Sequence, residues 1–275
     1  MNRIVITGLI APFLALPAQS ALADTRTRIS LETGMEYFTG NYGSSQPTDI
    51  SYFPVTCKIQ GHDWAMKVTV PYLEITGAVH VVNGVGQTLP ASTSARQVRS
   101  GLGDVSLSAS ETILDGGTRG PSAIVTGKMK LATASNTKGL GTGRNDYALE
   151  TTLLNPMDRL TPFGTVGYKK YGSPADYKLN NVFYGSLGGN YRIGQSTNGG
   201  MMYIASQKVM DNRAPRSELL FFASHTLEKK WKVQGYLLRG LTSSVPKWGG
   251  GIHVSYNFEV VHDPVKTNPS GAGES

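Results

Sequence analysis

Apolar and polar residues alternate with a period of two along most of the chain, a pattern typical of β-strands with one apolar face. The first such segment carries apolar residues on one face and polar or small residues on the other: Ile29, Leu31, Met35 and Tyr37 against Ser30, Glu32, Gly34 and Glu36. Helical spacing would mix these two sets. The pattern therefore predicts a strand here and not a helix.

The same reading predicts eleven further strands, which brings the total to twelve. They lie near 50–59, 64–72, 102–114, 120–132, 145–155, 159–171, 181–193, 199–209, 217–228, 230–240 and 248–258. The alternation is weakest in the eighth strand, which Gly185, Gly188 and Gly189 thin, and in the tenth. The clearer segments have the length that crosses a bilayer when a strand is tilted.

The connections between these segments differ in length in a regular way. Short ones lie at 60–62, 115–120, 155–158, 194–198 and 228–229, and longer ones lie near 40–49, 74–101, 133–144 and 172–180, with intermediate ones near 210–216 and 241–247. Outer-membrane barrels have short turns on the periplasmic side and longer loops outside. The sequence thus predicts an all-β fold, a transmembrane antiparallel β-barrel of about twelve strands with the N- and C-termini periplasmic.

The N-terminus has the features of a signal peptide. Arg3 precedes an apolar run over 4–18, and Ala21-Leu22-Ala23 has the small-x-small pattern that signal peptidase recognises. The run is too short for a membrane-spanning helix. We therefore expect a signal peptide at 1–23, a barrel at 24–258, and a disordered periplasmic tail at 259–275.

Charge and composition agree with an exported membrane barrel. Loss of Arg3 with the signal peptide lowers the formal charge from +7 to +6, and the basic residues are scattered, so nucleic acid is not an expected partner. A single cysteine, Cys57, excludes an intramolecular disulfide. Only 39% of residues are apolar and 33 are glycine, which suits a closed barrel whose alternate residues face lipid.

Aromatic residues are expected near the two membrane interfaces. Those near the predicted periplasmic ends are Trp64, Trp231, Tyr256 and Phe258, and those near the opposite ends are Tyr37, Tyr72, Tyr168, Tyr171 and Tyr184. The last strand ends in alternating apolar residues and an aromatic, Phe258, and so resembles the C-terminal signal that the barrel assembly machinery recognises. Outer-membrane lipid and this machinery are thus expected partners.

Polar and charged side chains on the opposite faces are expected to line the lumen, because lipid would reject them. These candidate pore-lining residues are Glu32, Glu36, Lys58, Lys67, Lys128, Lys130 and Glu150, together with Thr69, Ser106 and Ser108. The excess of Lys over Glu gives a faint preference for anions. An alternative remains open, in which Glu and Lys pair across a packed interior that conducts nothing.

A series of short motifs lies between residues 100 and 150. It comprises Gly101-Leu102-Gly103-Asp104, Pro121-Ser122, Lys130-Leu131-Ala132-Thr133 and Lys138-Gly139-Leu140-Gly141-Thr142-Gly143 followed by Asp146-Tyr147. In this order the motifs resemble those of the outer-membrane "meta-pathway of phenol degradation" family, although Ala132 replaces the usual proline. The resemblance implies an outer-membrane transporter or channel for a small solute connected with aromatic catabolism, and no catalytic residues.

The glycine-rich motif at 138–143 allows more than one interpretation. A flexible surface loop is favoured over a phosphate-binding loop, since no helix follows it. The loop could also fold inward as a constriction, in which case Lys138, Arg144 and Asp146 would contact the solute. A non-conducting structural or surface-interaction barrel is the alternative to a channel.

An outer-membrane enzyme acting on lipid is the third class. Ser224 and His225 are neighbours on a strand and point to opposite faces, which excludes them as nucleophile and base. His253 and Ser255 share a face, but they are too far apart for direct proton transfer and no acidic residue to orient the histidine is evident. The histidines show no metal-binding spacing, so neither a metal nor a cofactor is expected.

Overall fold

The computed structural model describes residues 27–77, 79–81, 88–90, 97–117, 119–175, 177–228 and 230–260. The expected signal peptide at 1–23 and residues 261–275 of the expected tail lie outside the described residues. Within the described ranges, no helix is long and apolar enough to cross a membrane.

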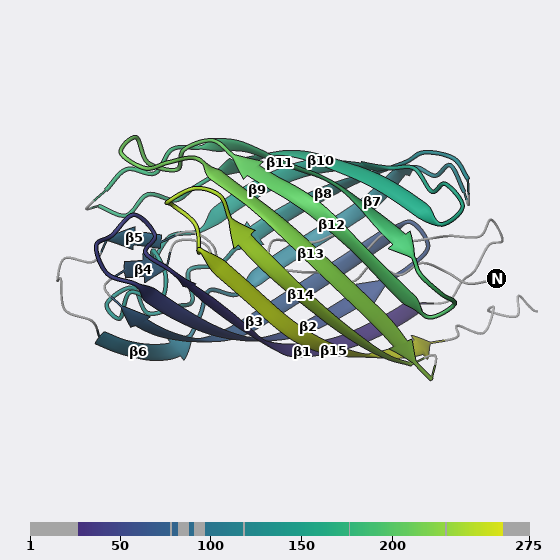
Figure 1. Cartoon of the computed structure of the whole chain (residues 1–275), viewed down its shortest axis with the longest axis horizontal. Coiled ribbons are helices and arrows are strands. Elements are labelled where there is room, and N and C mark those ends of the chain that lie inside the picture. The colour runs from purple at the N-terminus through teal and green to yellow at the C-terminus, as the bar shows by residue number, and fades with distance from the viewer. Residues whose placement is uncertain are drawn as a thin grey trace, which may run out of the picture.

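The described chain is built from fifteen β-strands (Figure 1). They are β1 (Thr27–Gly40), β2 (Thr48–Gln60), β3 (Trp64–Gly77), β4 (Val79–Val81), β5 (Thr88–Pro90), β6 (Gln97–Leu102), β7 (Ser106–Leu114), β8 (Ser122–Lys130), β9 (Asp146–Leu154), β10 (Leu160–Lys170), β11 (Val182–Arg192), β12 (Thr197–Ser206), β13 (Arg216–Leu227), β14 (Trp231–Gly240) and β15 (Trp248–Val260).

Antiparallel pairing closes the main sheet on itself. Strand β1 pairs with β15 on one side and with β2 on the other, β2 also pairs with β3, and the remaining strands follow in chain order. The first residues of β3 pair with β7 and its last residues pair with β6, so β6 and β7 together fill one position in the wall. The thirteen strands of this sheet therefore form a closed barrel of twelve positions, which confirms the predicted fold.

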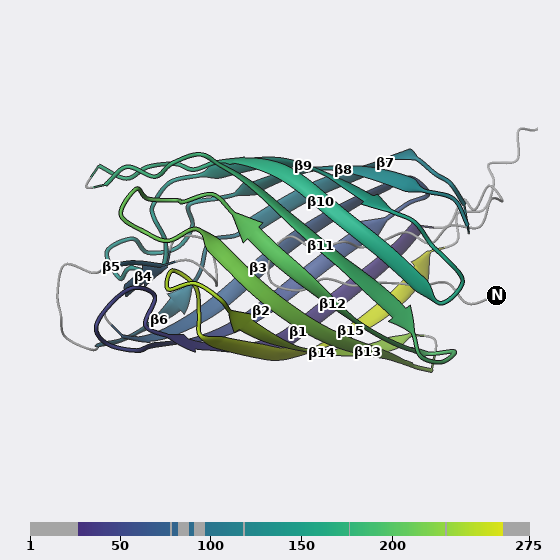
Figure 2. The ribbon, with the colours of Figure 1, turned by 45° about the horizontal axis from the view of Figure 1, so that its top comes forward.

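All the short connections lie at one end of the barrel, which we call the turn end, and the longer ones lie at the other, the loop end (Figures 1 and 2). The register pairs Thr27 with Val260, so β1 begins and β15 ends at the turn end. Strand β15 continues two residues past Phe258, into the segment that was expected to be tail.

The expectation of a long loop over 74–101 is wrong at both of its ends. Strand β3 continues to Gly77 and β6 begins at Gln97, and these two ends pair with each other from Tyr72 to Gly77. Strands β4 and β5 form a separate two-stranded ladder at the loop end (Figure 2). The barrel wall is thus taller at this position than the alternation of residues indicated.

The outer surface is apolar, as a wall in contact with lipid requires. Aromatic residues are exposed near both ends of the strands. Those near the turn end include Trp64, Tyr191, Trp231 and Phe258, and those near the loop end include Tyr37, Tyr72, Tyr147, Tyr168, Phe183, Tyr203 and Trp248. Tyr171 and Tyr184, which were expected among them, instead lie inside: Tyr171 is buried in an apolar cluster and Tyr184 donates a hydrogen bond to Glu150.

The apolar outer surface, which we call the apolar belt, predicts that a charged residue on β10 lowers the free energy of unfolding by an amount that depends on its depth in the membrane. Val166 and Leu160 both point outward, at 63% and 44% exposure, but Val166 lies mid-strand and Leu160 begins the strand at the turn end. We expect Val166→Arg to destabilise the lipid-inserted barrel by roughly 2–4 kcal/mol and Leu160→Arg by about 0–1 kcal/mol. Urea unfolding in liposomes measures both. Equal costs at the two positions would contradict the proposed placement of the belt.

Candidate functional site in the barrel lumen

The structure places the seven charged pore-lining candidates on the inner face of the wall. Glu36, Lys58, Lys130 and Glu150 are buried there, and Glu32, Lys67 and Lys128 are half-buried. The register sets Ser106 directly opposite Thr69 and Lys130, and Ser108 directly opposite Lys67 and Lys128, so the serines and Thr69 share this face. Whether the set lines a conducting path stays a prediction.

Part of the lumen is filled by paired charges. Lys128 forms an ion pair with Glu150, which also accepts a hydrogen bond of 2.7 Å from the hydroxyl of Tyr184. Near the loop end, Arg216 donates to Oε2 of Glu218 through Nε and Nη2, at 2.8 and 2.6 Å. These pairs correspond to the packed interior that was kept open as an alternative.

His253 lies between two carboxylates of β1. Its Nε2 is 2.9 Å from Oε1 of Glu36, and its Nδ1 is 3.4 Å from Oε1 of Glu32. Gly34 makes room for the ring, because a Cβ there would lie 2.7 Å from Nδ1. The sequence had shown no acidic neighbour for this histidine, so the structure corrects that expectation. Both ring nitrogens of His253 face carboxylates, so neither nitrogen is directed at Ser255 to act as a general base.

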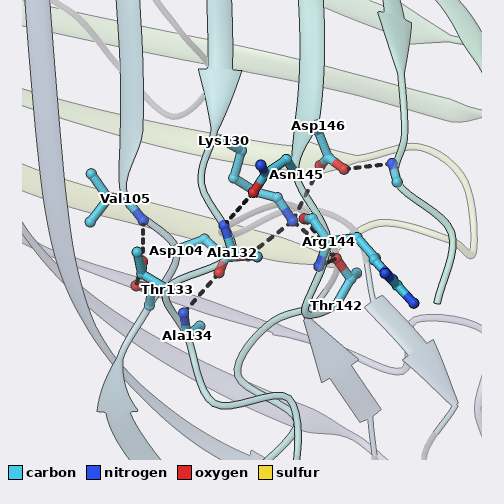
Figure 3. Close-up of polar contacts among 12 residues, drawn as sticks. Asp104, Val105, Lys130, Ala132, Thr133, Ala134, Thr142, Arg144, Asn145 and Asp146 are labelled. Carbon is cyan, nitrogen blue, oxygen red and sulfur yellow. Dashed lines mark hydrogen bonds and ion pairs between the residues drawn. The ribbon is translucent and has the colours of Figure 1, made fainter.

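The motifs at 101–147 converge on one buried ion network (Figure 3). Nζ of Lys130 lies 2.9 Å from Oδ2 of Asp104 and 3.3 Å from Oδ2 of Asp146, and Nζ of Lys169 lies 3.6 Å from the same oxygen of Asp146. These residues come from the segment before β7, the end of β8, the start of β9 and the end of β10. The network thus joins four neighbouring wall positions at the loop end.

Hydrogen bonds tie the connection between β8 and β9, residues 131–145, to this network. The backbone N–H of Ala134 donates to Oδ1 of Asp104 at 2.9 Å, and Nζ of Lys130 donates to Oγ1 of Thr142 at 3.2 Å. Thr133 accepts from the N–H of Val105 at 2.8 Å (Figure 3). We call this segment the latched loop.

The latched loop brings an apolar residue into the barrel. Leu140 is buried in the same apolar cluster as Phe38 and Leu73, and Gly141 packs so closely that a Cβ would lie 2.8 Å from Oδ2 of Asp104. Lys138 and Arg144, two of the three constriction candidates, are exposed. The third candidate, Asp146, is buried in the ion network. The loop buries Leu140 in the barrel, and contact of Lys138, Arg144 and Asp146 with a solute stays a prediction.

An apolar row winds around the inner wall, with one residue on each successive strand. In register order, from β9 through β10 to β15 and on through β1 and β2 to β3, it contains Leu154, Phe163, Gly188, Met202, Leu220, Leu238, Gly249, Phe38, Ile50 and Ile75. Its non-glycine members all belong to one buried cluster. The rings of Phe163 and Phe38 occupy the space beside Gly188 and Gly249, since a Cβ at either glycine would collide with them.

The apolar row connects the two ends of the barrel. It begins at Leu154, the last residue of β9 at the turn end, and finishes at Ile75, two residues from the loop end of β3. The strands are tilted, so a row of directly paired residues climbs the wall as it goes round (Figure 1). Alternation along single strands could not reveal this row, because it depends on the offset between strands.

Comparison with known proteins agrees with the motifs. The family model described as "Putative MetA-pathway of phenol degradation" matches residues 18–258. The chain belongs to this family. The motifs that resemble those of the family include Asp104, Lys130, Leu140 and Asp146, which lie in the ion network and in the latched loop. The comparison with curated proteins gives no match.

Several solved structures are similar to this chain. The KdgM porin is 11% identical, with 83% of this chain and 99% of that chain covered and a TM-score of 0.51. The translocator domain of autotransporter NalP from Neisseria meningitidis is 13% identical, covering 85% and 89%, with a TM-score of 0.46. The CymD monoaromatic hydrocarbon channel is 9% identical, covering 88% and 90%, at 0.41. The likeness to the KdgM porin shows that the barrel has the outer-membrane fold.

The ion network predicts unequal roles for two lysines that flank the latched loop. Lys130→Met leaves two buried carboxylates without the cation they share, and breaking a buried pair in this way costs roughly 3–5 kcal/mol. Lys138→Met removes an exposed side chain and should change stability by less than about 0.5 kcal/mol. Urea titration of the refolded barrel in micelles would measure both. Similar midpoints for the two variants would show that the network does not stabilise the fold.

Proposed function

We propose that this protein is an outer-membrane channel for passive movement of a small solute with an apolar, aromatic body. The observation that carries this proposal is the apolar row, which runs inside the barrel from the turn end to the loop end. In porins that pass hydrophilic solutes the interior is polar and filled with water. A continuous row of apolar side chains instead offers contact to an apolar solute along its whole path.

The family supports the same solute class, because its description refers to phenol degradation. A phenol-like compound has an aromatic ring and few polar groups. It would therefore lose little hydration free energy on moving from water to contact with the side chains of Phe163, Met202 or Leu220. In this proposal the turn end, with both ends of the barrel sheet, faces the periplasm and the loop end faces outward.

The latched loop sets where the path is narrow. Leu140 of the latched loop is almost fully buried among the apolar residues at the loop end. Tyr42, which lies in the loop between β1 and β2, is buried in the same cluster. The backbone oxygen of Tyr42 accepts a hydrogen bond of 2.6 Å from Nη1 of Arg213. A solute entering from outside therefore passes between Leu140 and Tyr42 when these loops separate.

A non-conducting structural barrel is the second candidate. The observation that favours it is the set of buried ion pairs, Lys128 with Glu150 and Lys130 with Asp104 and Asp146, which fill part of the lumen. Planar-bilayer recordings separate the two candidates. Discrete conductance steps support the channel, and a tight seal over many insertions supports the structural barrel.

Uptake measurements in porin-deficient Gram-negative cells test the apolar path directly. We expect expression of the protein to increase the initial uptake of radiolabelled toluene. Met202→Gln should lower that increase by about tenfold, because an amide buried without a partner costs roughly 1–3 kcal/mol. The matched control is Met201→Gln, at the adjacent position whose side chain points outward.

The two variants make the same change at neighbouring residues on opposite faces of β12, and only Met202 belongs to the apolar row. Heat-modifiable migration on gels confirms that each barrel is folded in the outer membrane. Unchanged uptake in Met202→Gln, or an equal loss in Met201→Gln, would remove the support for an apolar path through the lumen.

A further inference from the structure

Two lysines face each other directly on the inner wall. Lys58 of β2 and Lys67 of β3 are paired in the antiparallel register, and both point into the lumen. Nζ of Lys58 donates a hydrogen bond of 2.7 Å to Oε1 of Gln60. Within the described part of the chain, the side chain of Lys67 makes no hydrogen bond or ion pair. Like charges placed directly opposite in a sheet repel and destabilise it.

The carboxylates near this pair have other cationic neighbours as well. Lys58 also interacts electrostatically with Arg28 and Lys232, which repel it, and with Glu32, which attracts it. Glu32 is itself in contact with His253, at 3.4 Å. Lys67 is attracted by Glu32 and by Glu150, which forms an ion pair with Lys128. The nearby carboxylates are therefore shared with other cations, and the pair keeps an excess of positive charge.

The lysine pair begins a second row that winds around the wall. In register order from β2 to β10 the row contains Lys58, Lys67, Ser108, Lys128, Ala148 and Lys169. Lys128 and Lys169 have acidic partners, Glu150 and Asp146. Positions 58 and 67 lie two and three residues from the turn ends of β2 and β3. The excess of positive charge is thus located near the turn end of the lumen.

The apolar row passes on the wall that faces this pair. Strands β3 and β12 are six positions apart in either direction around the twelve-position barrel, so Met202 of β12 lies across the lumen from β3. Met202 lies five residues from the turn end of β12, so the body of a solute held at the lysine pair would extend toward the loop end to reach it. Charge-assisted hydrogen bonds from lysine suit a carboxylate, and apolar side chains suit a hydrocarbon body.

We propose that Lys58 and Lys67 form a binding site for the carboxylate group of a solute with an apolar body. This inference rests on the proposed function in that the solute occupies the same lumen, and it narrows the solute class from aromatic compounds in general to organic anions. The anion removes the repulsion between the facing ammonium groups, so binding stabilises the folded barrel.

Thermal unfolding of the refolded barrel in micelles, with sodium benzoate as the probe, tests the site without any need for conduction. At about ten times the dissociation constant, benzoate should raise the unfolding temperature by about 3 °C, as linkage predicts for a domain of this size. Sodium chloride at equal ionic strength and benzyl alcohol at equal concentration should each give less than half of that shift.

Variants then locate the effect. The double variant Lys58→Gln/Lys67→Gln should lose the benzoate shift, and the charge-preserving double variant Lys58→Arg/Lys67→Arg should keep it. Lys170→Gln, an exposed lysine on β10, is the matched control and should also keep it. If the glutamine variant does not fold, loss of the shift in the singly substituted Lys67→Gln replaces it as the test.

The outcomes distinguish failure of the carboxylate site from failure of the channel. No shift in the wild type, an equal shift with chloride, or a shift that persists in the glutamine variants would overturn the carboxylate site. Toluene uptake that depends on Met202 would still support the channel in any of these cases. Conversely, benzoate binding that requires Lys58 and Lys67 in a barrel that gives neither uptake nor conductance would support the site and overturn the channel.

Discussion

The pairing of every wall position with two neighbouring positions is the constraint on which the rest of this structure depends. Hydrocarbon offers no partner for backbone N–H and C=O groups, so a sheet that crosses it must close without an edge. The pairing of β1 with β15, together with that of β2 with β3, provides the closure. Closure requires tilted strands, and tilt makes each row of paired residues wind around the lumen.

The closed wall decides how the interior can be filled. One face of each strand must be apolar toward lipid, so the charged residues collect inside, where each needs a partner. Lys128 with Glu150 and the network around Lys130 satisfy this requirement by pairing across strands. Glycines provide the remaining space, as at Gly188 and Gly249, which accommodate aromatic rings from neighbouring strands. The lumen therefore combines ion pairs, an apolar row and one region of excess positive charge.

This arrangement explains in physical terms the motif at 101–147 that resembles the family. Its residues are separated by up to about forty positions along the chain, yet Asp104, Lys130 and Asp146 meet in one ion network. Leu140 and Gly141 are the residues that the network holds inside the barrel. The glycines at 139 and 143 have positive φ angles of 68° and 65°, which turns of this kind need and other residues rarely adopt. The motif thus specifies a loop conformation.

Much of the fold could be predicted from residue alternation, including the strands weakened by Gly185 or by the apolar run at 219–222. The inward placement of Glu36, Lys58 and Glu150 followed from the same pattern. The conformations of the loops could not be predicted, because loop residues have no alternating face: Leu140 is buried and Lys138 is exposed. The extension of β3 and β6 was missed because the inner residues there, Leu73 and Ile75, are as apolar as lipid-facing ones.

The sequence by itself therefore determined the twelve wall positions, apart from the extension of β3 and β6, and which face of each strand meets lipid, because both depend on neighbours along the chain. Only the tertiary structure decided which residues stand side by side across strands, because that depends on the register between segments far apart in the chain. The contact of His253 with Glu32 and Glu36, the apolar row and the facing pair of Lys58 and Lys67 all belong to this second kind.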